Sequence, residues 1–225
     1  MISKLFEYCI LHKFNDVFTF SDMQFGFRKG SGCSHAIFLL REVIDYFASH
    51  GSTVYMAALD ARKAFDRVNH VKLFNLLLDN YVPPRVVRVI CDWYGKTTCV
   101  VRWRNCLSED FVVKSGIRQG GILSPVLFNM YFDTLLCELR RNGEGCYLGR
   151  HYVGCIAYAD DLILLSASLC NLQSMLDVCH SVGSSLDIAF NSSKSYLFKI
   201  GPLLSISLGS TLAVMIFNGQ TGLST

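Results

Sequence analysis

Residues 152–166 read Tyr-Val-Gly-Cys-Ile-Ala-Tyr-Ala-Asp-Asp-Leu-Ile-Leu-Leu-Ser, two apolar runs that meet at a pair of aspartates. Each run is short and mostly apolar, which predicts a strand. Only Ala159, Asp160 and Asp161 separate the runs, so we expect an antiparallel hairpin with the acidic pair at its turn. An Asp-Asp pair alone would favour a turn whose side chains accept backbone hydrogen bonds. The apolar sequence on both sides reverses that preference and indicates a functional pair.

A third aspartate has the same kind of surroundings. Residues 54–59 read Val-Tyr-Met-Ala-Ala-Leu, a run too short for a helix, and we interpret them as a buried strand that ends at Asp60. An isolated ionised carboxylate at the edge of a core is costly, so each acid needs a partner. Hard divalent cations accept such oxygen ligands. If Asp60 joins Asp160 and Asp161 from a neighbouring strand, two cations about 4 Å apart would support phosphoryl transfer.

The composition is that of a folded protein with reduced thiols. The 225 residues are 51% hydrophobic, which is enough for one large domain or two small ones. Charged residues make up only 17%, below the roughly 25% of typical soluble domains, which hints at a fragment with covered surface. The net charge of +3 is too small to indicate a polyanionic partner by itself. Ten scattered cysteines without CxxC spacing, and no signal peptide, favour an intracellular protein without structural zinc.

The alternation of strand-like and helix-like stretches predicts an α+β or α/β domain. We expect helices at 35–50, 70–80, 84–94, 125–139 and 172–182, and strands at 54–59, 98–104, 110–115, 152–158, 162–166 and 196–200. The run from 200 to 217 is apolar but interrupted by glycine, proline and serine, so we do not expect it to span a membrane. Residues 201–225 hold no charged residue, and the sequence does not establish which fold that tail adopts.

Five motifs, in order along residues 1–200, resemble those of the reverse transcriptase domain of non-LTR (LINE-like) retrotransposons. They are Gln24–Gly30 (QFGFRKG), Leu59–Asp66 (LDARKAFD), Ser115–Pro125 (SGIRQGGILSP), Tyr158–Asp161 (YADD) and Asn191–Lys194 (NSSK). Five motifs in this order make a chance match implausible. The resemblance implies a right-hand polymerase palm, an antiparallel sheet with helices on one face, together with partial fingers and without a thumb.

The resemblance also implies a division into domains. Residues 1–56 would be partial fingers, residues 57–200 the palm with an interleaved fingers segment at about 67–114, and residues 201–225 a divergent tail. The family's first fingers strands would precede residue 1, and its thumb would follow residue 200. We therefore expect missing fingers and thumb segments in a longer polyprotein, and weak or undetectable activity from these 225 residues alone.

Individual roles follow from the resemblance. Asp60, Asp160 and Asp161 would be catalytic and would hold two Mg²⁺ ions, with Mn²⁺ as an alternative. Lys194 would act as general acid for the leaving pyrophosphate, although an exposed turn lysine is the ordinary interpretation of this residue. The remaining roles concern binding of the incoming nucleotide, and they fall on Arg28, Phe65, Gln119, Gly120 and Tyr158.

Four of these nucleotide-binding roles have a chemical reason. The guanidinium fork of Arg28 matches triphosphate oxygens. The ring of Phe65 would collide with a 2′-hydroxyl and so favour deoxynucleotides, although an aromatic near a strand end usually belongs to the core. Gln119 can bond the sugar or base, and Gly120 permits close approach of the backbone.

Two further features carry open alternatives. We expect Asp66 to have a structural role, either pairing with Arg67 or capping the helix near Asn69. The sequence Arg-Trp-Arg at 102–104 combines charge with stacking area, which suits a nucleic-acid backbone. A surface hairpin whose arginine stems cover apolar area explains that sequence equally well.

The resemblance implies an RNA-directed DNA polymerase that adds a dNMP to a primer 3′-hydroxyl. Its partners would be an RNA template, a DNA primer and dNTPs, with no membrane, in the nucleus and cytoplasm. The alternative is an inactive, truncated relic of a retrotransposon polymerase, an interpretation that the missing segments support. A nucleotidyl cyclase or another palm-like phosphotransferase is a third hypothesis, and the Arg-Gln-Gly motif at 118–120 argues against it.

Overall fold

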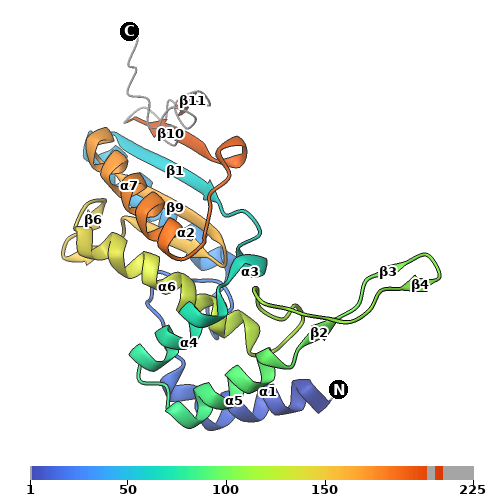
Figure 1. The fold of residues 1–225 in the computed structure, drawn as a ribbon. Coiled ribbons are helices and arrows are strands. Elements are labelled where there is room, and N and C mark those ends of the chain that lie inside the picture. The colour runs from blue at the N-terminus through green and yellow to red at the C-terminus, as the bar shows by residue number, and fades with distance from the viewer. Residues whose placement is uncertain (1, 202–205, 210–225) are drawn as a thin grey trace. The chain divides into compact units, whose positions relative to one another are not determined.

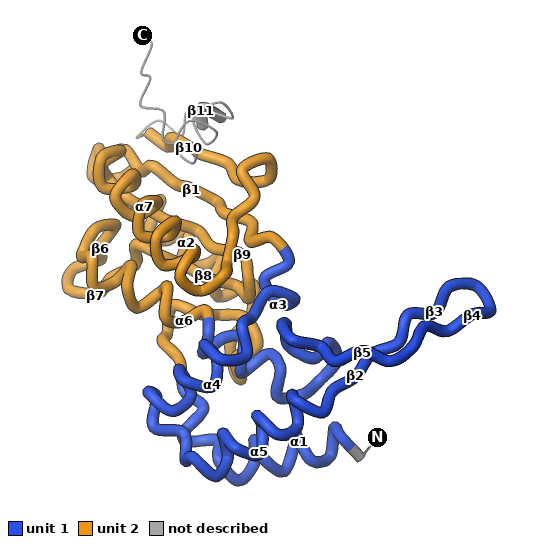
Figure 2. Tube along the Cα trace, in the orientation of Figure 1, with its two compact units in different colours: residues 1–19, 63–131 blue, residues 20–62, 132–225 orange. Residues whose placement is uncertain are grey.

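The computed structural model describes residues 2–201 and 206–209, and the chain divides into two compact units (Figure 2). Unit 1 comprises residues 1–19 and 63–131, and unit 2 comprises residues 20–62 and 132–225. Each unit therefore combines two segments that are far apart in the sequence. These limits differ from the expected domain boundaries at 56 and 200, and the assignment of fingers and palm to those ranges stays a prediction.

Unit 2 is built on a five-stranded antiparallel sheet (Figure 1). The strands, in spatial order, are β11 (Ile206–Gly209), β10 (Tyr196–Ile200), β1 (Val54–Asp60), β9 (Asp161–Ser166) and β8 (Cys155–Tyr158). The strands predicted at 54–59, 162–166 and 196–200 are confirmed. The strand predicted at 152–158 is divided, because Val153 and Gly154 separate β7 from β8.

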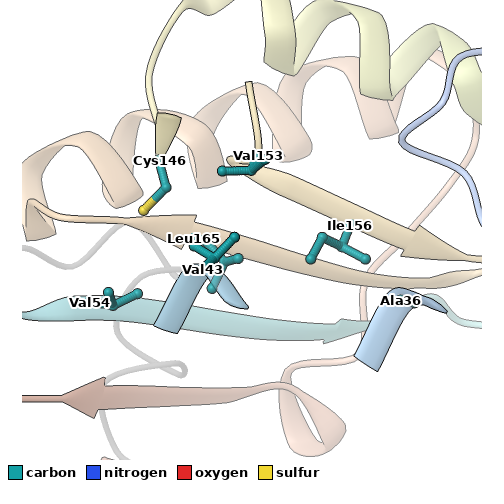
Figure 3. Packing of buried hydrophobic residues seen from close by; sticks show 7 residues of the cluster. All are labelled: Ala36, Val43, Val54, Cys146, Val153, Ile156 and Leu165. Carbon is teal, nitrogen blue, oxygen red and sulfur yellow. The ribbon is translucent and has the colours of Figure 1, made fainter. Parts of the chain in front are cut away.

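Helices cover both faces of this sheet. Helix α2 (Cys33–Ser49) packs on one face through its buried Ala36 and Val43 (Figure 3). These two side chains belong to a buried cluster with Val54, Cys146, Val153, Ile156 and Leu165. Helix α7 (Leu169–Ser185) lies against the opposite face. Residues 162–165 of β9 read Leu-Ile-Leu-Leu, so alternation makes both faces apolar and both need cover. The predicted α+β class is confirmed, whereas the restriction of helices to one face is wrong.

The rest of unit 2 connects these layers. Helix α6 (Ser124–Asn142) begins in unit 1, and its residues from 132 onward belong to unit 2. A short ribbon of β6 (Tyr147–Leu148) and β7 (His151–Tyr152) follows it. The 3₁₀ turn η2 (Ser192–Lys194) precedes β10.

Unit 1 is mainly helical. Its elements before the arm described below are α1 (Ile2–Lys13), the 3₁₀ turn η1 (Asn15–Val17), α3 (Ala64–Arg67), α4 (His70–Asp79) and α5 (Pro84–Gly95). Pro84 occupies the first turn of α5, where its missing N–H costs no hydrogen bond. The largest fully buried side chains of the unit include Leu73, Leu77, Ile90, Leu127 and Phe128. The predicted helices at 70–80, 84–94 and 125–139 are confirmed.

A thin ribbon extends from the end of α5 within unit 1, and we call residues 98–112 the hairpin arm (Figure 1). In it β2 (Thr98–Cys99) pairs with β5 (Phe111–Val112), and β3 (Arg102–Trp103) pairs with β4 (Cys106–Leu107). Every residue of these four strands is exposed, and Trp103 keeps 74% of its surface in solvent. The predicted hairpin is confirmed, in shorter pieces than expected.

Among the described residues, no helix combines the length and the apolarity that crossing a lipid bilayer requires. The apolar run from 200 to 217 and the charge-free tail after residue 201 fall largely outside the described residues.

Candidate active site

Strand pairing brings three aspartates to one end of the unit 2 sheet. Asp60 is the last residue of β1, and it stands opposite Asp161, the first residue of β9. Asp160 lies in the turn between β8 and β9, where Tyr158 pairs with Asp161. The hairpin expected from the sequence thus exists, and its acidic turn adjoins the strand that ends at Asp60.

Two of the three aspartates, Asp160 and Asp161, have a raised pKa. Burial raises the pKa of Asp160, and the neighbouring charges of Asp161 and Asp60 raise it further, although its own backbone hydrogen bond opposes this. Burial and the charge of Asp60 likewise raise the pKa of Asp161. Within the described residues, no Lys or Arg side chain forms an ion pair with any of the three. Such a group of acids favours binding of an external positive charge.

The donor set suits a hard divalent cation, because carboxylate oxygens are the ligands that Mg²⁺ prefers. As the side chains stand, no three Asp, Glu, His or Cys residues in the described part of the chain converge closely enough to hold a metal ion. The backbone therefore places the aspartates together, and a cation would have to draw their side chains inward. Their role as metal ligands stays a prediction.

A buried glutamine holds the acidic turn. Ala159 has a φ of 57°, in the left-handed region that residues with a Cβ rarely adopt. Gln24 has 0% of its surface exposed, and its Oε1 accepts the Ala159 N–H at 2.9 Å. Its Nε2 donates to the Ala159 carbonyl at 3.0 Å. In the sequence, Gln24 is only the first residue of the QFGFRKG motif, because a contact across 135 positions leaves no local pattern.

The segment that contains Lys194 contacts the end of β1. The Asn191 N–H donates to the Asp60 carbonyl at 2.8 Å, and the Asp60 N–H donates to Ser195 Oγ at 3.4 Å. Lys194 itself is exposed. The structure therefore places the lysine's segment beside Asp60, and its role as general acid stays a prediction.

Phe65 and the loop from Ser115 to Leu123, which we call the RQG loop, contact each other in unit 1. The Phe65 ring stacks on the Phe128 ring with centroids 4.0 Å apart and planes at 14°. The Ile117 N–H donates to the Phe65 carbonyl at 2.9 Å. Gly120 is exposed with a φ of 76°, and no atom lies within 4 Å of the place where a Cβ would stand.

Asp66 contacts this loop directly. Its Oδ1 accepts a hydrogen bond from Gln119 Nε2 at 3.1 Å. The structural role expected for Asp66 thus involves Gln119, and the expected pairing with Arg67 is wrong. Asn69 caps α4 with its own side chain, which accepts two backbone N–H groups of the first turn.

Glu7 of α1 also holds the RQG loop. This carboxylate is buried, and its Oε2 accepts the N–H groups of Ile122 and, at 3.0 Å, of Leu123. Arg118 Nη1 lies 3.9 Å from Glu7 Oε1, and the Arg118 guanidinium lies over the Trp93 ring at 5.6 Å. All of these except Ile122 line a cavity of about 760 Å³ in unit 1. No sequence pattern identified Glu7, because a single glutamate on a helix is usually a solvated charge.

The two remaining predicted nucleotide contacts lie in unit 2. Arg28 is exposed, its Nη1 donates to the Ser21 carbonyl at 3.0 Å, and its guanidinium lies 6.0 Å from the Phe20 ring centroid. Tyr158 is 38% exposed at the end of β8. The predicted nucleotide contacts are thus divided: Arg28 and Tyr158 belong to unit 2, and Phe65 and the RQG loop belong to unit 1.

Known proteins resemble this chain over most of its length. The sequence profile of the family described as reverse transcriptase (RNA-dependent DNA polymerase) matches residues 1–213. The Pol polyprotein of the type-2 retrotransposable element R2DM of Drosophila melanogaster is 29% identical over 184 residues, 82% of this chain and 17% of the polyprotein. A probable RNA-directed DNA polymerase from transposon BS of the same organism is 29% identical over 174 residues, 75% of this chain and 18% of that protein. The chain therefore spans less than a quarter of the length of these relatives.

A solved structure shares the fold. The telomerase of Candida tropicalis, in complex with a TWJ fragment of telomeric RNA, superposes with a TM-score of 0.65 at 14% sequence identity. The match covers 91% of this chain and 36% of the telomerase chain. At this identity the likeness establishes the palm-like α+β fold alone.

Proposed function

Because the chain belongs to the reverse transcriptase family, with non-LTR retrotransposon polyproteins among its relatives, we propose that unit 2 carries the catalytic centre of an RNA-directed DNA polymerase. The reaction adds a deoxynucleotide to a primer 3′-hydroxyl on an RNA template. One observation carries the proposal: Asp60 stands opposite Asp161, and Asp160 lies in the adjoining turn. Intact carboxylates at one sheet end do not favour the alternative of an inactive relic.

Asp60, Asp160 and Asp161 would hold two Mg²⁺ ions, and Mn²⁺ suits the same oxygen donors. When bound, these cations would activate the attacking hydroxyl and neutralise the leaving phosphate. The chain contributes the fixed backbone of β1 and of the turn, which keeps three acids together despite their repulsion. Since the pKa values of Asp160 and Asp161 are raised, cation binding would strengthen as pH rises and these acids ionise.

The remaining residues would bind the nucleotide. Phe65 would exclude a 2′-hydroxyl, and its stacking on Phe128 supports this role because a gate must keep its ring in place. Gln119 and Gly120 would contact the sugar or base, from a loop that Asp66 and Glu7 hold.

Two basic residues, Arg28 and Lys194, would act on the phosphates of the nucleotide. Arg28 donates to the Ser21 carbonyl and would have to exchange this bond for one to the triphosphate. Lys194 would protonate the leaving pyrophosphate, from a segment bonded to the backbone of Asp60. Tyr158 would border the nucleotide from the end of β8.

An RNA template is the partner with the broadest support. The relative from transposon BS is described as a probable RNA-directed DNA polymerase, and the telomerase structure contains an RNA fragment. A DNA primer and dNTPs complete the proposal. The other segments of the longer relatives would supply further contacts to these partners.

Primer extension on an RNA template with dNTPs and Mg²⁺ tests the proposal. The double variant Asp160→Asn, Asp161→Asn should lose at least about 10³-fold of the activity, because the acids act as a unit. Asp177→Asn, an exposed aspartate of α7, is the matched control and should extend normally. Because we expect only weak activity from these 225 residues, the comparison is made where the unmodified chain gives a measurable product, and an equal product from the double variant would refute the assignment. A parallel Mn²⁺ titration should show binding that the double variant lacks.

A further inference from the structure

The turn that carries Asp160 has an unfavourable backbone that needs support. Ala159 has a positive φ of 57°, and its Cβ makes that conformation costly. The turn is also next to three acidic side chains that repel one another. A turn under both strains would relax unless other residues fixed its N–H and carbonyl groups.

Gln24 fixes both groups with one side chain. Its amide oxygen accepts the Ala159 N–H at 2.9 Å, and its amide nitrogen donates to the Ala159 carbonyl at 3.0 Å. The same oxygen also accepts the Gly26 N–H at 2.9 Å. Both polar atoms of this fully buried side chain are therefore used, which is the condition under which a buried amide adds specificity.

Backbone hydrogen bonds attach the glutamine's own segment to β8. The Phe25 N–H donates to the Ala157 carbonyl at 2.8 Å, and the Ala157 N–H donates to the Met23 carbonyl at 2.9 Å. Gln24 thus pairs with Ala157 in a parallel bridge at the edge of the sheet. The base of the glutamine side chain cannot move independently of the strand that leads into the turn.

Gly26 makes the close approach possible. A Cβ at this position would collide with the Ala159 backbone nitrogen and would stand 3.1 Å from both the Ala159 Cα and Gln24 Oε1. Any larger residue would therefore displace either the turn or the glutamine. The glycine at this position of the QFGFRKG motif thus has a physical reason, which is its close contact with the acidic turn.

We propose that Gln24 is a positioning residue of the catalytic centre, holding Ala159 in its left-handed conformation so that Asp160 and Asp161 remain presented to divalent cations. The inference rests on the proposed function for the identity of the aspartates as ligands. A neutral amide suits this place, since a carboxylate would add a fourth negative charge. A hydrocarbon would leave the N–H and carbonyl of Ala159 unpaired.

The main test is the affinity of the chain for Mn²⁺, measured by the electron paramagnetic resonance signal of the free ion. Gln24→Met keeps the length of the side chain and removes both bonds to Ala159. It should weaken Mn²⁺ binding about 10–100-fold, as the loss of residues that orient metal ligands does. Gln173→Met, on the surface of α7, is the matched control and should bind as the unmodified chain does.

A rescue experiment separates positioning from simple core filling. Glycine adopts positive φ without the Cβ penalty, so Ala159→Gly in the Gln24→Met background should recover most of the lost affinity. If Gln24 only filled space in the core, Ala159→Gly would not restore the Mn²⁺ affinity of Gln24→Met. Gln24→Asn, which keeps the amide but shortens its reach, replaces Gln24→Met if the latter does not fold.

Hydrogen exchange at the Ala159 amide completes the test. Exchange should be slow in the unmodified chain and fast in Gln24→Met, and the affinity loss should accompany this change. Faster exchange with unchanged Mn²⁺ affinity would overturn the inference and leave the proposed function intact. If the unmodified chain and the Asp160→Asn, Asp161→Asn variant bind Mn²⁺ equally, the proposed function itself fails.

Discussion

Two loops of this molecule are held in the same way by side chains of different charge. In unit 2, the neutral amide of Gln24 holds the turn of Asp160 through the backbone of Ala159. In unit 1, the carboxylate of Glu7 holds the RQG loop through the N–H groups of Ile122 and Leu123. Both side chains are buried, and both come from the first thirty residues.

The difference follows from what surrounds each side chain. Gln24 lies among acids, so it adds no charge and uses one donor and one acceptor. Glu7 accepts two backbone N–H groups just before the start of α6, and the Arg118 guanidinium lies 3.9 Å away, so a negative charge suits its surroundings. The charge of each buried side chain therefore complements its electrostatic environment, and exchanging the charges tests this complementarity.

The largest effect is expected for Gln24→Glu. This variant loses the donor to Ala159 and buries a fourth negative charge, so it should cost about 3–5 kcal/mol of unfolding free energy at pH 7. At acidic pH the introduced carboxyl is protonated and donates again, so the loss should shrink. Urea denaturation at two pH values measures both quantities. An equal loss of unfolding free energy at both pH values would show that the added negative charge is not the cause of the loss.

A smaller effect is expected at Glu7. Glu7→Gln keeps the shape but weakens the bonds to the two N–H groups, and should cost about 1.5 kcal/mol of unfolding free energy. Glu7→Ala leaves both N–H groups unpaired and should cost about 3 kcal/mol. Glu138→Gln, whose partner Arg141 is exposed, serves as control and should cost almost nothing. If Glu7→Gln lost no more unfolding free energy than Glu138→Gln, the negative charge of Glu7 would not be needed to hold the RQG loop.

Asp160 and Asp161 should make stability depend on pH. Their folded-state pKa values are raised, so the stability they contribute is fully present below their unfolded pKa and is lost as pH rises through the folded pKa. Without divalent cations, the unmodified chain should therefore lose stability relative to Asp161→Asn as pH rises above about 4, the ordinary pKa of an aspartate. Urea midpoints across this range measure the difference, and millimolar Mg²⁺ should reduce it. A relative gain with pH would contradict the arrangement of these acids.

The smallest effect is expected in the hairpin arm, all of whose strand residues are exposed. Trp103 is 74% exposed, so Trp103→Ala should change the unfolding free energy by less than about 0.5 kcal/mol. Thermal denaturation of the two proteins measures this. A loss above about 2 kcal/mol would mean that the arm is packed in solution.

Local patterns predicted the elements but not the contacts that hold the site. The strand at 54–59 and the acidic hairpin were predictable because alternation and apolar flanks act within a few residues. We predicted helices on one face of the sheet, and they cover both faces. The Leu-Ile-Leu-Leu sequence at 162–165, which is apolar at every position, could have indicated this. The roles of Gln24 and Glu7 were not predictable, since their partners are 135 and about 115 positions away and each side chain alone is ordinary.

The contact between Gln24 and Ala159 also has a consequence for how the protein is made. The two residues are 135 positions apart. A ribosome adds roughly 5–20 residues per second, so about 7 to 27 seconds pass between the synthesis of one partner and the other. During that time the buried amide has no partner and must remain hydrated. The turn that carries Asp160 can therefore take shape only after residue 159 has been made, when its acids and the side chain that fixes them are first present together.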